Sequence, residues 1–332
     1  MSVDSADSDA LRTARLAMLA ALIDGDVKNA RELALRLLED GYAFDEIVEG
    51  VFAPVQGEFG RRWASGDLGV ADEHAASEAV AQLITHLSAV AETPTGPKVV
   101  AVAPEHDAHG LGARVVTASL VLEGFDAVFL GASLPPEDLG DYLRAQEPYA
   151  LILSCSVTAA LASAARSVAA AHDEGIAVIA GGSALPDEER ATRIGADSFA
   201  RSARDVTLTL HDWAQTPPSS LQVAPDPIPE QRSLWTRSAA VVAAAMASAS
   251  ERAERPDRLA DEMRWLLLVL ESSVLLGEPN LLVEHLEWLR SVAPTHGVGR
   301  DTIDAGISAL VDALDGDLGR LGRALATAYG VA

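Results

Sequence analysis

A histidine, an aspartate and two glycines follow the short apolar run that ends at residue 103, and their spacing suits metal ligation. The segment reads Glu105-His106-Asp107-Ala108-His109-Gly110-Leu111-Gly112. If the run is a strand, His109 stands at its carboxyl end, where it can ligate a group lying over the edge of a sheet. Asp107 can accept the second ring N–H of His109 and fix its tautomer, as metal-bound histidine requires. Gly110 and Gly112 would let a large flat ligand approach the backbone.

Taken alone, this segment has a plainer interpretation as a surface loop in which a histidine happens to lie near an acid. It does not have the pattern of a dinucleotide-binding loop. Val115 stands where the third glycine should be, and the next apolar run ends at Leu130-Gly131 without an acid for a ribose.

Two further motifs, each after its own apolar run, complete a resemblance to cobalamin-binding domains of the base-off, His-on type. The three motifs are Asp107-x-His109-x-x-Gly112, Ser156-Val157-Thr158 and Gly181-Gly182. The resemblance implies that His109 is the lower axial ligand of cobalt and that Ser156 and Thr158 line the channel for the nucleotide tail. It also implies that the paired glycines make room for the benzimidazole. Singly, Ser and Thr often begin helices and Gly-Gly is a common turn.

A fourth pattern lies upstream, where nine residues separate Trp63 from Glu73-His74. This Trp-x9-Glu-His spacing resembles the CarH-type light-responsive cobalamin proteins, in which a helical bundle caps the upper face of adenosylcobalamin. The resemblance implies that Trp63 packs on the adenosyl group and that Glu73 hydrogen-bonds it. His74 would coordinate cobalt from above after illumination. A core tryptophan and a solvated Glu-His pair are the structural alternatives.

The elements that must position these residues follow from hydrophobic periodicity. Residues 8–93 show apolar residues at three- and four-residue intervals, which predicts a four-helix bundle with helices near 11–22, 27–38, 44–63 and 70–90. Pro54 should kink the third helix or lie in a first turn. Residues 97–213 alternate apolar runs with helix-length segments, which predicts a flavodoxin-like, doubly wound parallel sheet. The predicted strands are 98–103, 126–130, 149–153, 176–180 and 197–200.

A Pro-rich linker over 214–231 precedes a third region, 232–332, which reads as helical throughout. Its helices are expected near 233–253, 257–276, 280–292, 300–314 and 317–329, with Pro256 and Pro279 in first turns. The fold class is therefore α/β plus all-α. A cobalamin light sensor followed by a globin-like helical domain resembles the photocobilins, which hold biliverdin beside the cobalamin.

The third region has no cysteine, so a bilin would be held noncovalently. Aromatic rings, cations for propionates and imidazoles for pyrrole nitrogens are available as candidate bilin contacts: Arg264, Trp265, His285, Trp288, His296 and Arg300. His285 also shares a helix face with apolar residues, as a core histidine would. A globin-like fold could hold haem through His285 or His296 instead.

Composition limits the classes of partner. Lys+Arg total 25 against 49 Asp+Glu, and the net charge of −24 argues against binding a nucleic-acid backbone. CarH-type proteins carry a DNA-binding domain before the bundle, whereas the bundle here begins almost at the first residue, so we expect no contact with DNA. No apolar run approaches the length of a membrane span, and the single cysteine, Cys155, excludes an internal disulfide. We expect a cytoplasmic protein.

The leading hypothesis is a photoreceptor without turnover, whose light-broken cobalt–carbon bond changes a homo-oligomer, a dimer or a higher assembly, and signals to a downstream protein. The alternative is an enzyme component, the corrinoid-carrying subunit of a cobalamin-dependent methyltransferase or mutase. The three cobalamin motifs suit both, and the Trp63, Glu73 and His74 pattern favours the sensor. A third possibility is an interaction module that has kept its motifs without binding cobalamin.

Overall fold

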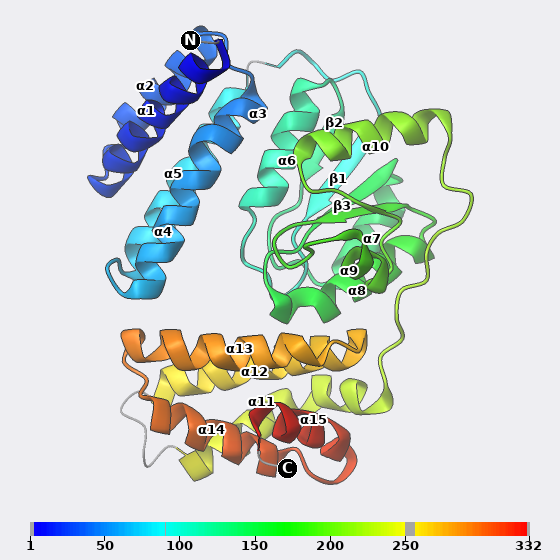
Figure 1. Ribbon diagram of the computed structural model, residues 1–332. Helices are drawn as coiled ribbons and strands as arrows, with labels where there is room; N and C mark the ends of the chain where they lie inside the picture. The colour runs from blue at the N-terminus through cyan, green and yellow to red at the C-terminus, as the bar shows by residue number, and fades with distance from the viewer. Residues whose placement is uncertain (1–2, 90, 250–255, 331–332) are drawn as a thin grey trace.

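The computed structural model describes residues 3–89, 91–249 and 256–330, with side chains from residue 9 onward and without that of residue 248. A helical bundle, a sheet domain and a second set of helices follow one another along the chain and surround a common centre (Figure 1). None of the described helices is long and apolar enough to cross a membrane.

The N-terminal bundle has the predicted helices, except that the first begins at Val3, eight residues before its predicted start, and the third contains a π-helical turn. Its elements are α1 (Val3–Ile23), α2 (Val27–Glu39), α3 (Phe44–Ile47), a π-helical turn (Val48–Phe52), α4 (Ala53–Ser65) and α5 (Val70–Ser88). The predicted third helix is a continuous helical segment formed by α3, the π turn and α4. Pro54 lies in the first turn of α4. Asp26 caps α2 by accepting a hydrogen bond from the backbone N–H of Asn29 at 3.0 Å. Gly66 ends α4 in the left-handed conformation, with φ 81°.

The middle domain is a five-stranded parallel sheet in the order β2-β1-β3-β4-β5, which is the flavodoxin-like order. The strands are β1 (Lys98–Val102), β2 (Asp126–Phe129), β3 (Ala150–Ser154), β4 (Val178–Gly181) and β5 (Ser198–Phe199). Between and after them lie α6 (Leu111–Leu122), α7 (Pro136–Gln146), a 3₁₀ turn (Thr158–Ala160), α8 (Leu161–Asp173), α9 (Glu188–Arg193) and α10 (Ala203–Gln215). All five strands fall within two residues of the predicted runs.

The two faces of the sheet are both covered, because side chains alternate along each strand. Val99 and Ala101 of β1 pack with α6 and α10, and Val100 and Val102 pack with α7 and α8. This arrangement leaves the carboxyl ends of the strands for the loops that carry the cobalamin-type motifs.

The C-terminal region is helical, as predicted. Its helices are α11 (Pro229–Ala249), α12 (Pro256–Leu276), α13 (Pro279–Val292), α14 (Arg300–Ala313) and α15 (Gly319–Tyr329), with 3₁₀ turns at Ala293–His296 and Gly316–Leu318. Pro256 and Pro279 begin their helices. The first helix begins at Pro229, inside the predicted linker, and its predicted end at 253 lies outside the described residues.

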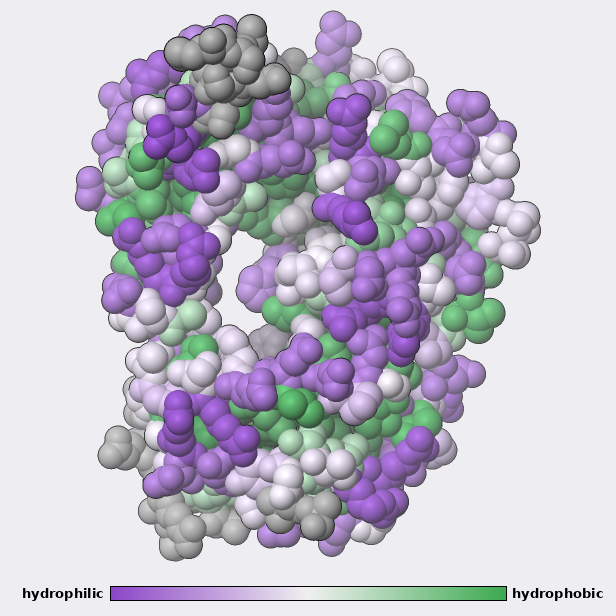
Figure 2. Space-filling model, viewed as in Figure 1, coloured by the Kyte–Doolittle hydropathy of each residue, from purple (hydrophilic) through white to green (hydrophobic). Residues whose placement is uncertain are grey.

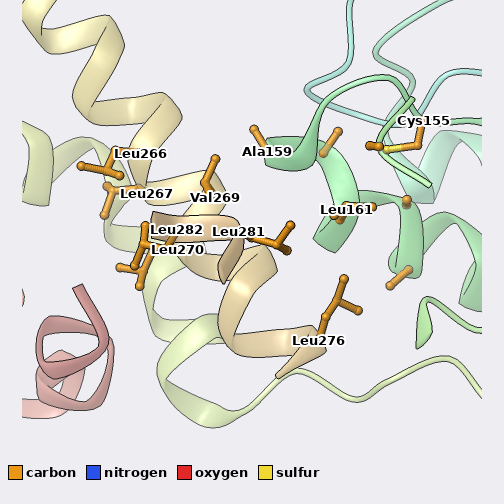
Figure 3. Packing of buried hydrophobic residues seen from close by; sticks show 14 of the residues in the cluster. Cys155, Ala159, Leu161, Leu266, Leu267, Val269, Leu270, Leu276, Leu281 and Leu282 are labelled. Atoms are coloured by element: carbon orange, nitrogen blue, oxygen red, sulfur yellow. The ribbon is translucent and has the colours of Figure 1, made fainter. Parts of the chain in front are cut away.

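The three parts share hydrophobic packing. The core of the bundle continues onto α6 through Ala118, with Leu111 and Val115 packed against it. On the opposite side of the sheet, one continuous cluster joins the sheet, α8 and the C-terminal helices. Figure 3 shows Leu161 of α8 and Ala159 close to the leucines of α12 and α13. The C-terminal helices therefore pack on the sheet domain as part of its core.

Candidate functional site

His109 and Asp107 form the pair expected from their spacing. Asp107 is fully buried, and its Oδ1 lies 2.9 Å from both the backbone N and the Nδ1 of His109. Because an ionised carboxylate only accepts hydrogen bonds, His109 donates Nδ1–H and leaves Nε2 as an open lone pair. The His109 side chain is 62% exposed. The geometry fits a histidine ready to ligate one metal ion from a fixed tautomer.

Asp107 also joins two strand ends. Its Oδ2 accepts a hydrogen bond from the backbone N–H of Ser156, in the loop after β3. Ser156 and Thr158 lie partly buried in that loop, and Thr158 begins the 3₁₀ turn. The carbonyl of Ser156 accepts a hydrogen bond from Ser183 Oγ at 2.9 Å, which ties in the loop after β4. The three motifs therefore meet at one edge of the sheet.

The loop after β1 is held in a strained conformation. His106 has φ 68° and Ser133, in the loop after β2, has φ 56°, and both are uncommon for residues with a side chain. Ser133 Oγ accepts a hydrogen bond from the N–H of His106 at 3.1 Å, and Ser133 N–H donates to the carbonyl of Asp107 at 2.9 Å. Ser133 was not anticipated from the sequence, because it belongs to no motif.

The four motif glycines pack so closely against other protein atoms that an added Cβ would clash with them. A Cβ on Gly110 would lie 2.8 Å from the Phe129 ring, and one on Gly112 would lie 2.8 Å from Ser154 Oγ. Gly181 lies at the end of β4, with the carbonyl oxygen of residue 200 at 2.3 Å from its Cβ position. Gly182 has φ 106°, and a Cβ there would lie 2.3 Å from the oxygen of residue 155. Close backbone packing is thus one physical reason for these glycines.

On the bundle, Trp63 lies in the last turn of α4, and Glu73 and His74 lie in the first turns of α5. Glu73 Oε2 lies 3.0 Å from His74 Nδ1, and Glu73 Oε1 accepts a hydrogen bond from Ser77 Oγ at 2.7 Å. The His74 side chain is 75% exposed, so its Nε2 is open to solvent. Glu73 thus contacts His74 through Nδ1, the same ring atom by which His109 contacts Asp107.

The charge of Glu73 also affects His109, in the loop after β1. The pKa of His109 is raised, chiefly by its hydrogen bond to Asp107 and against the opposing effect of burial, with the charges of Asp107 and Glu73 adding to the rise. Glu73 therefore lies near enough to act on His109 electrostatically. The start of α5 faces the carboxyl edge of the sheet.

Three of the six candidate bilin contacts come together against the bundle. His296 stacks on Trp63 with ring centroids 4.8 Å apart, and Trp288 stacks on Trp63 at 6.4 Å. His285 stacks on Trp288 at 5.7 Å. The buried Nε2 atoms of His285 and His296 have no hydrogen-bond partner, and burial lowers the pKa of His285 to about 4. We call His285, Trp288, His296 and Trp63 the aromatic cluster.

The other three candidates lie on the surface. Arg264 pairs with Asp261 one turn earlier on α12, and Trp265 and Arg300 are exposed. Arg258, which the sequence did not suggest, donates a hydrogen bond to the carbonyl of His296 at 2.9 Å. It is a cation beside the aromatic cluster.

The space-filling view shows an opening between the bundle, the sheet domain and the C-terminal helices (Figure 2). A large ligand bound at the carboxyl edge of the sheet would enter a region bordered by all three parts. The donor set suits a metal that needs one axial nitrogen, because His109 presents a single oriented imidazole.

Comparison with known proteins identifies the ligand class. Two models, each described as a B12 binding domain, match residues 15–88 and residues 97–209. The chain is a cobalamin-binding protein.

This cobalamin-binding protein is similar to members of two functional groups. It is 35% identical over 140 residues to the HTH-type transcriptional repressor CarH of Myxococcus xanthus, a match covering 41% of this chain and 45% of the repressor, so the chain spans less than half of that relative. It is 26% identical over 198 residues to trimethylamine corrinoid protein 1 of Methanosarcina acetivorans, covering 56% of this chain and 90% of that protein.

Among solved structures, the monomethylamine corrinoid protein of Methanosarcina barkeri superposes with a TM-score of 0.50 and 19% identity, over 59% of this chain and 96% of that chain. This likeness shows the shared fold of the bundle and the sheet domain. The residues matched by the B12-binding models end before the C-terminal helices.

Proposed function

We propose that this cobalamin-binding protein is a light sensor that uses adenosylcobalamin. The observation that carries the proposal is the pair formed by Glu73 and His74 at the start of α5, in which Glu73 Oε2 lies 3.0 Å from Nδ1 of a His74 side chain that is 75% exposed. Trp63 lies in the last turn of α4 and the Glu73–His74 pair lies near the start of α5, so the three residues of the pattern come from consecutive helices of the bundle. The similarity to the CarH repressor supports the same assignment.

His109 would hold cobalt through Nε2, while Asp107 keeps the imidazole oriented. Adenosylcobalamin supplies a cobalt–carbon bond that light can break. Trp63 offers an aromatic face to the adenosyl group at the end of α4. His74 has its Nδ1 held by Glu73, and its exposed side chain is free to turn its Nε2 toward the site.

The signal is proposed to be a change in association between copies of this chain, with no catalytic turnover. Trp63 contacts His296 and Trp288 of the C-terminal region, so a movement of Trp63 repacks an interface between two parts of the molecule. Packed interfaces respond to such a change by switching between discrete arrangements. A downstream protein partner would recognise one of them.

The C-terminal helices are proposed to be a globin-like domain that binds biliverdin noncovalently at the aromatic cluster. The support is the pair of buried, unpartnered imidazole nitrogens of His285 and His296, which a polar tetrapyrrole could satisfy. Titration with biliverdin should give a red-shifted, structured absorption in the wild type and a weaker one in His285→Leu. A Soret band after loading with haem, without any response to biliverdin, would contradict this assignment.

The cobalamin site is tested by the affinity for adenosylcobalamin in dim red light. His109→Ala should greatly weaken binding, whereas His86→Ala should bind as the wild type does, since His86 is exposed near the end of α5. Wild-type affinity and an unchanged cobalt spectrum in His109→Ala would contradict the proposed ligand.

A second candidate function is the corrinoid-carrying subunit of a methyltransferase or mutase, favoured by the match to 90% of the length of the trimethylamine corrinoid protein. The two candidates differ in the upper ligand that the bundle selects. The sensor should bind adenosylcobalamin more tightly than methylcobalamin, and Trp63→Ala should remove the difference. Tighter binding of methylcobalamin by the wild type would favour the methyl carrier.

A further inference from the structure

Arg166 of α8 lies at the centre of a charge network that reaches two parts of the molecule. Its Nη1 donates a hydrogen bond to Glu271 Oε1 at 2.9 Å, and its Nη2 donates to Glu105 Oε2 at 3.3 Å. Glu271 belongs to α12, and Glu105 belongs to the same loop as His109. One guanidinium therefore holds the cobalamin-binding loop and the C-terminal helices at once.

The C-terminal end of this network is built into the core. The Glu271 side chain is only 4% exposed, and burial raises its pKa. Trp235 of α11 donates its indole N–H to Glu271 Oε1, and the Arg166 guanidinium lies over the Trp235 ring, 4.6 Å from its centroid. Because a buried carboxylate depends on its partner, Glu271 fixes the position of Arg166 firmly.

The other end acts on the loop. Glu105 lies directly before the strained residue His106, with its Oε2 3.9 Å from His106 Nε2. A loop held in a sparsely populated conformation needs surrounding contacts to keep it there. Ser133 supplies one of these contacts to His106, and Arg166 supplies another through Glu105.

We propose that Arg166 is a positioning residue that couples the cobalamin loop to the C-terminal helices. By holding Glu105, it keeps the loop in the conformation that presents His109, and by holding Glu271 it makes that conformation depend on the packing of α11 and α12. The coupling is reciprocal, so cobalamin bound at His109 also stabilises the packing of α11 and α12. This inference rests on the proposed role of His109.

The chain provides a matched control at the same domain boundary. Arg190 of α9 pairs with Glu278, ahead of α13, with Nη2–Oε2 at 2.8 Å, and the two side chains are 21% and 17% exposed. It joins the sheet domain to the C-terminal region as Arg166 does, but its side chain bonds to Glu278 and the carbonyl of Ala184, and its backbone N–H donates to Asp187, the N-cap of α9. Arg190→Gln therefore weakens the docking of the two parts without touching Glu105.

The first test is the affinity for adenosylcobalamin, measured by equilibrium dialysis in dim red light. Arg166→Gln and Glu105→Gln should each weaken binding about tenfold, within the usual range of coupling between sites. The double variant should be no weaker than either single one, since both remove the same link. Arg190→Gln should stay within about twofold of the wild type, as expected for a variant outside the network.

The second test measures the reverse direction by hydrogen exchange. Adenosylcobalamin should slow exchange in α11 and α12 of the wild type and of Arg190→Gln, and should not do so in Arg166→Gln. A merely structural role for Arg166 would raise exchange in the free protein without abolishing the response to cobalamin. If Arg166→Gln does not fold, Glu105→Gln, at a half-exposed loop position, provides the same comparison.

Equal affinities in Arg166→Gln and Arg190→Gln, or additive losses in the double variant, would overturn the coupling. His109→Ala separates this failure from that of the proposed site. If His109→Ala binds as the wild type does, the proposed ligand is wrong. If only His109→Ala binds adenosylcobalamin more weakly, His109 is the ligand and the proposed coupling through Arg166 is wrong.

Discussion

His285 makes the stability of the C-terminal helices depend on pH. Its imidazole lies on α13 against Trp288, with Nε2 buried and without a hydrogen-bond partner. Burial lowers its pKa from 6.5 to about 4, and no neighbouring charge contributes to the change. In the unfolded chain the imidazole returns to water and takes up a proton near pH 6.5.

The sign and the size follow from this difference. Because the folded-state pKa is the lower one, the unfolded chain binds the proton first as the pH falls. The free energy of unfolding therefore decreases as the pH falls from 6.5 to about 4. Each tenfold change in proton affinity corresponds to about 1.4 kcal/mol, so the full loss is about 3 kcal/mol. Between pH 8 and pH 5 the expected loss is about 2 kcal/mol.

Urea unfolding of the cofactor-free protein at pH 8 and pH 5, followed by tryptophan fluorescence, measures the effect. His285→Phe keeps an aromatic ring against Trp288 and should remove about 2 kcal/mol of the pH dependence seen in the wild type. His211→Phe, at an exposed histidine that contacts Phe125 at 5.5 Å, is the control and should leave the dependence unchanged. Equal pH dependence in wild type and His285→Phe would contradict the assignment of this effect to His285.

Three further predictions concern the cobalamin edge and the assembly. Asp107→Asn should weaken cobalamin binding about 10- to 100-fold, because an amide cannot accept all the hydrogen bonds that the carboxylate takes from His109 and Ser156; equilibrium dialysis checks this. Gly182→Ala should destabilise the protein by at least about 2 kcal/mol in urea unfolding, since its backbone conformation and the oxygen of residue 155 both disfavour a Cβ. Light should change the mass measured by light scattering after gel filtration of the adenosylcobalamin-loaded protein, and identical masses in the dark and in the light would contradict the proposed output.

The sheet and most helices could be predicted from the sequence because their signals are local. Apolar runs of four or five residues marked β1 to β4, whereas β5 was predicted from the shorter segment 197–200. First-turn prolines marked the starts of α12 and α13. The π turn at Val48–Phe52 could not be predicted, because its sequence continues the helical periodicity on both sides. The start of α11 at Pro229 was hidden by the Pro-rich composition around it.

Within the site, the Asp107–His109 hydrogen bond follows from a spacing of two residues and was predicted. Arg166 lies 61 positions after Glu105 and 105 positions before Glu271 in the sequence. Single charged residues carry no periodic signal, so the sequence did not indicate these contacts. The stacking of Trp63 on His296 likewise depends on how the bundle meets the C-terminal helices. Contacts of this kind, between different parts of the molecule, could be found only in the structure.

Light sensing is tested by the absorption spectrum of the adenosylcobalamin-loaded protein, recorded before and after green light. We expect a spectral change in the wild type. The illuminated spectrum of His74→Ala should differ from that of the illuminated wild type, because His74 is the residue that Glu73 contacts at the start of α5. His86→Ala, at the exposed histidine of the same helix, should respond as the wild type does. A wild-type spectrum that light leaves unchanged would contradict the proposed light sensing.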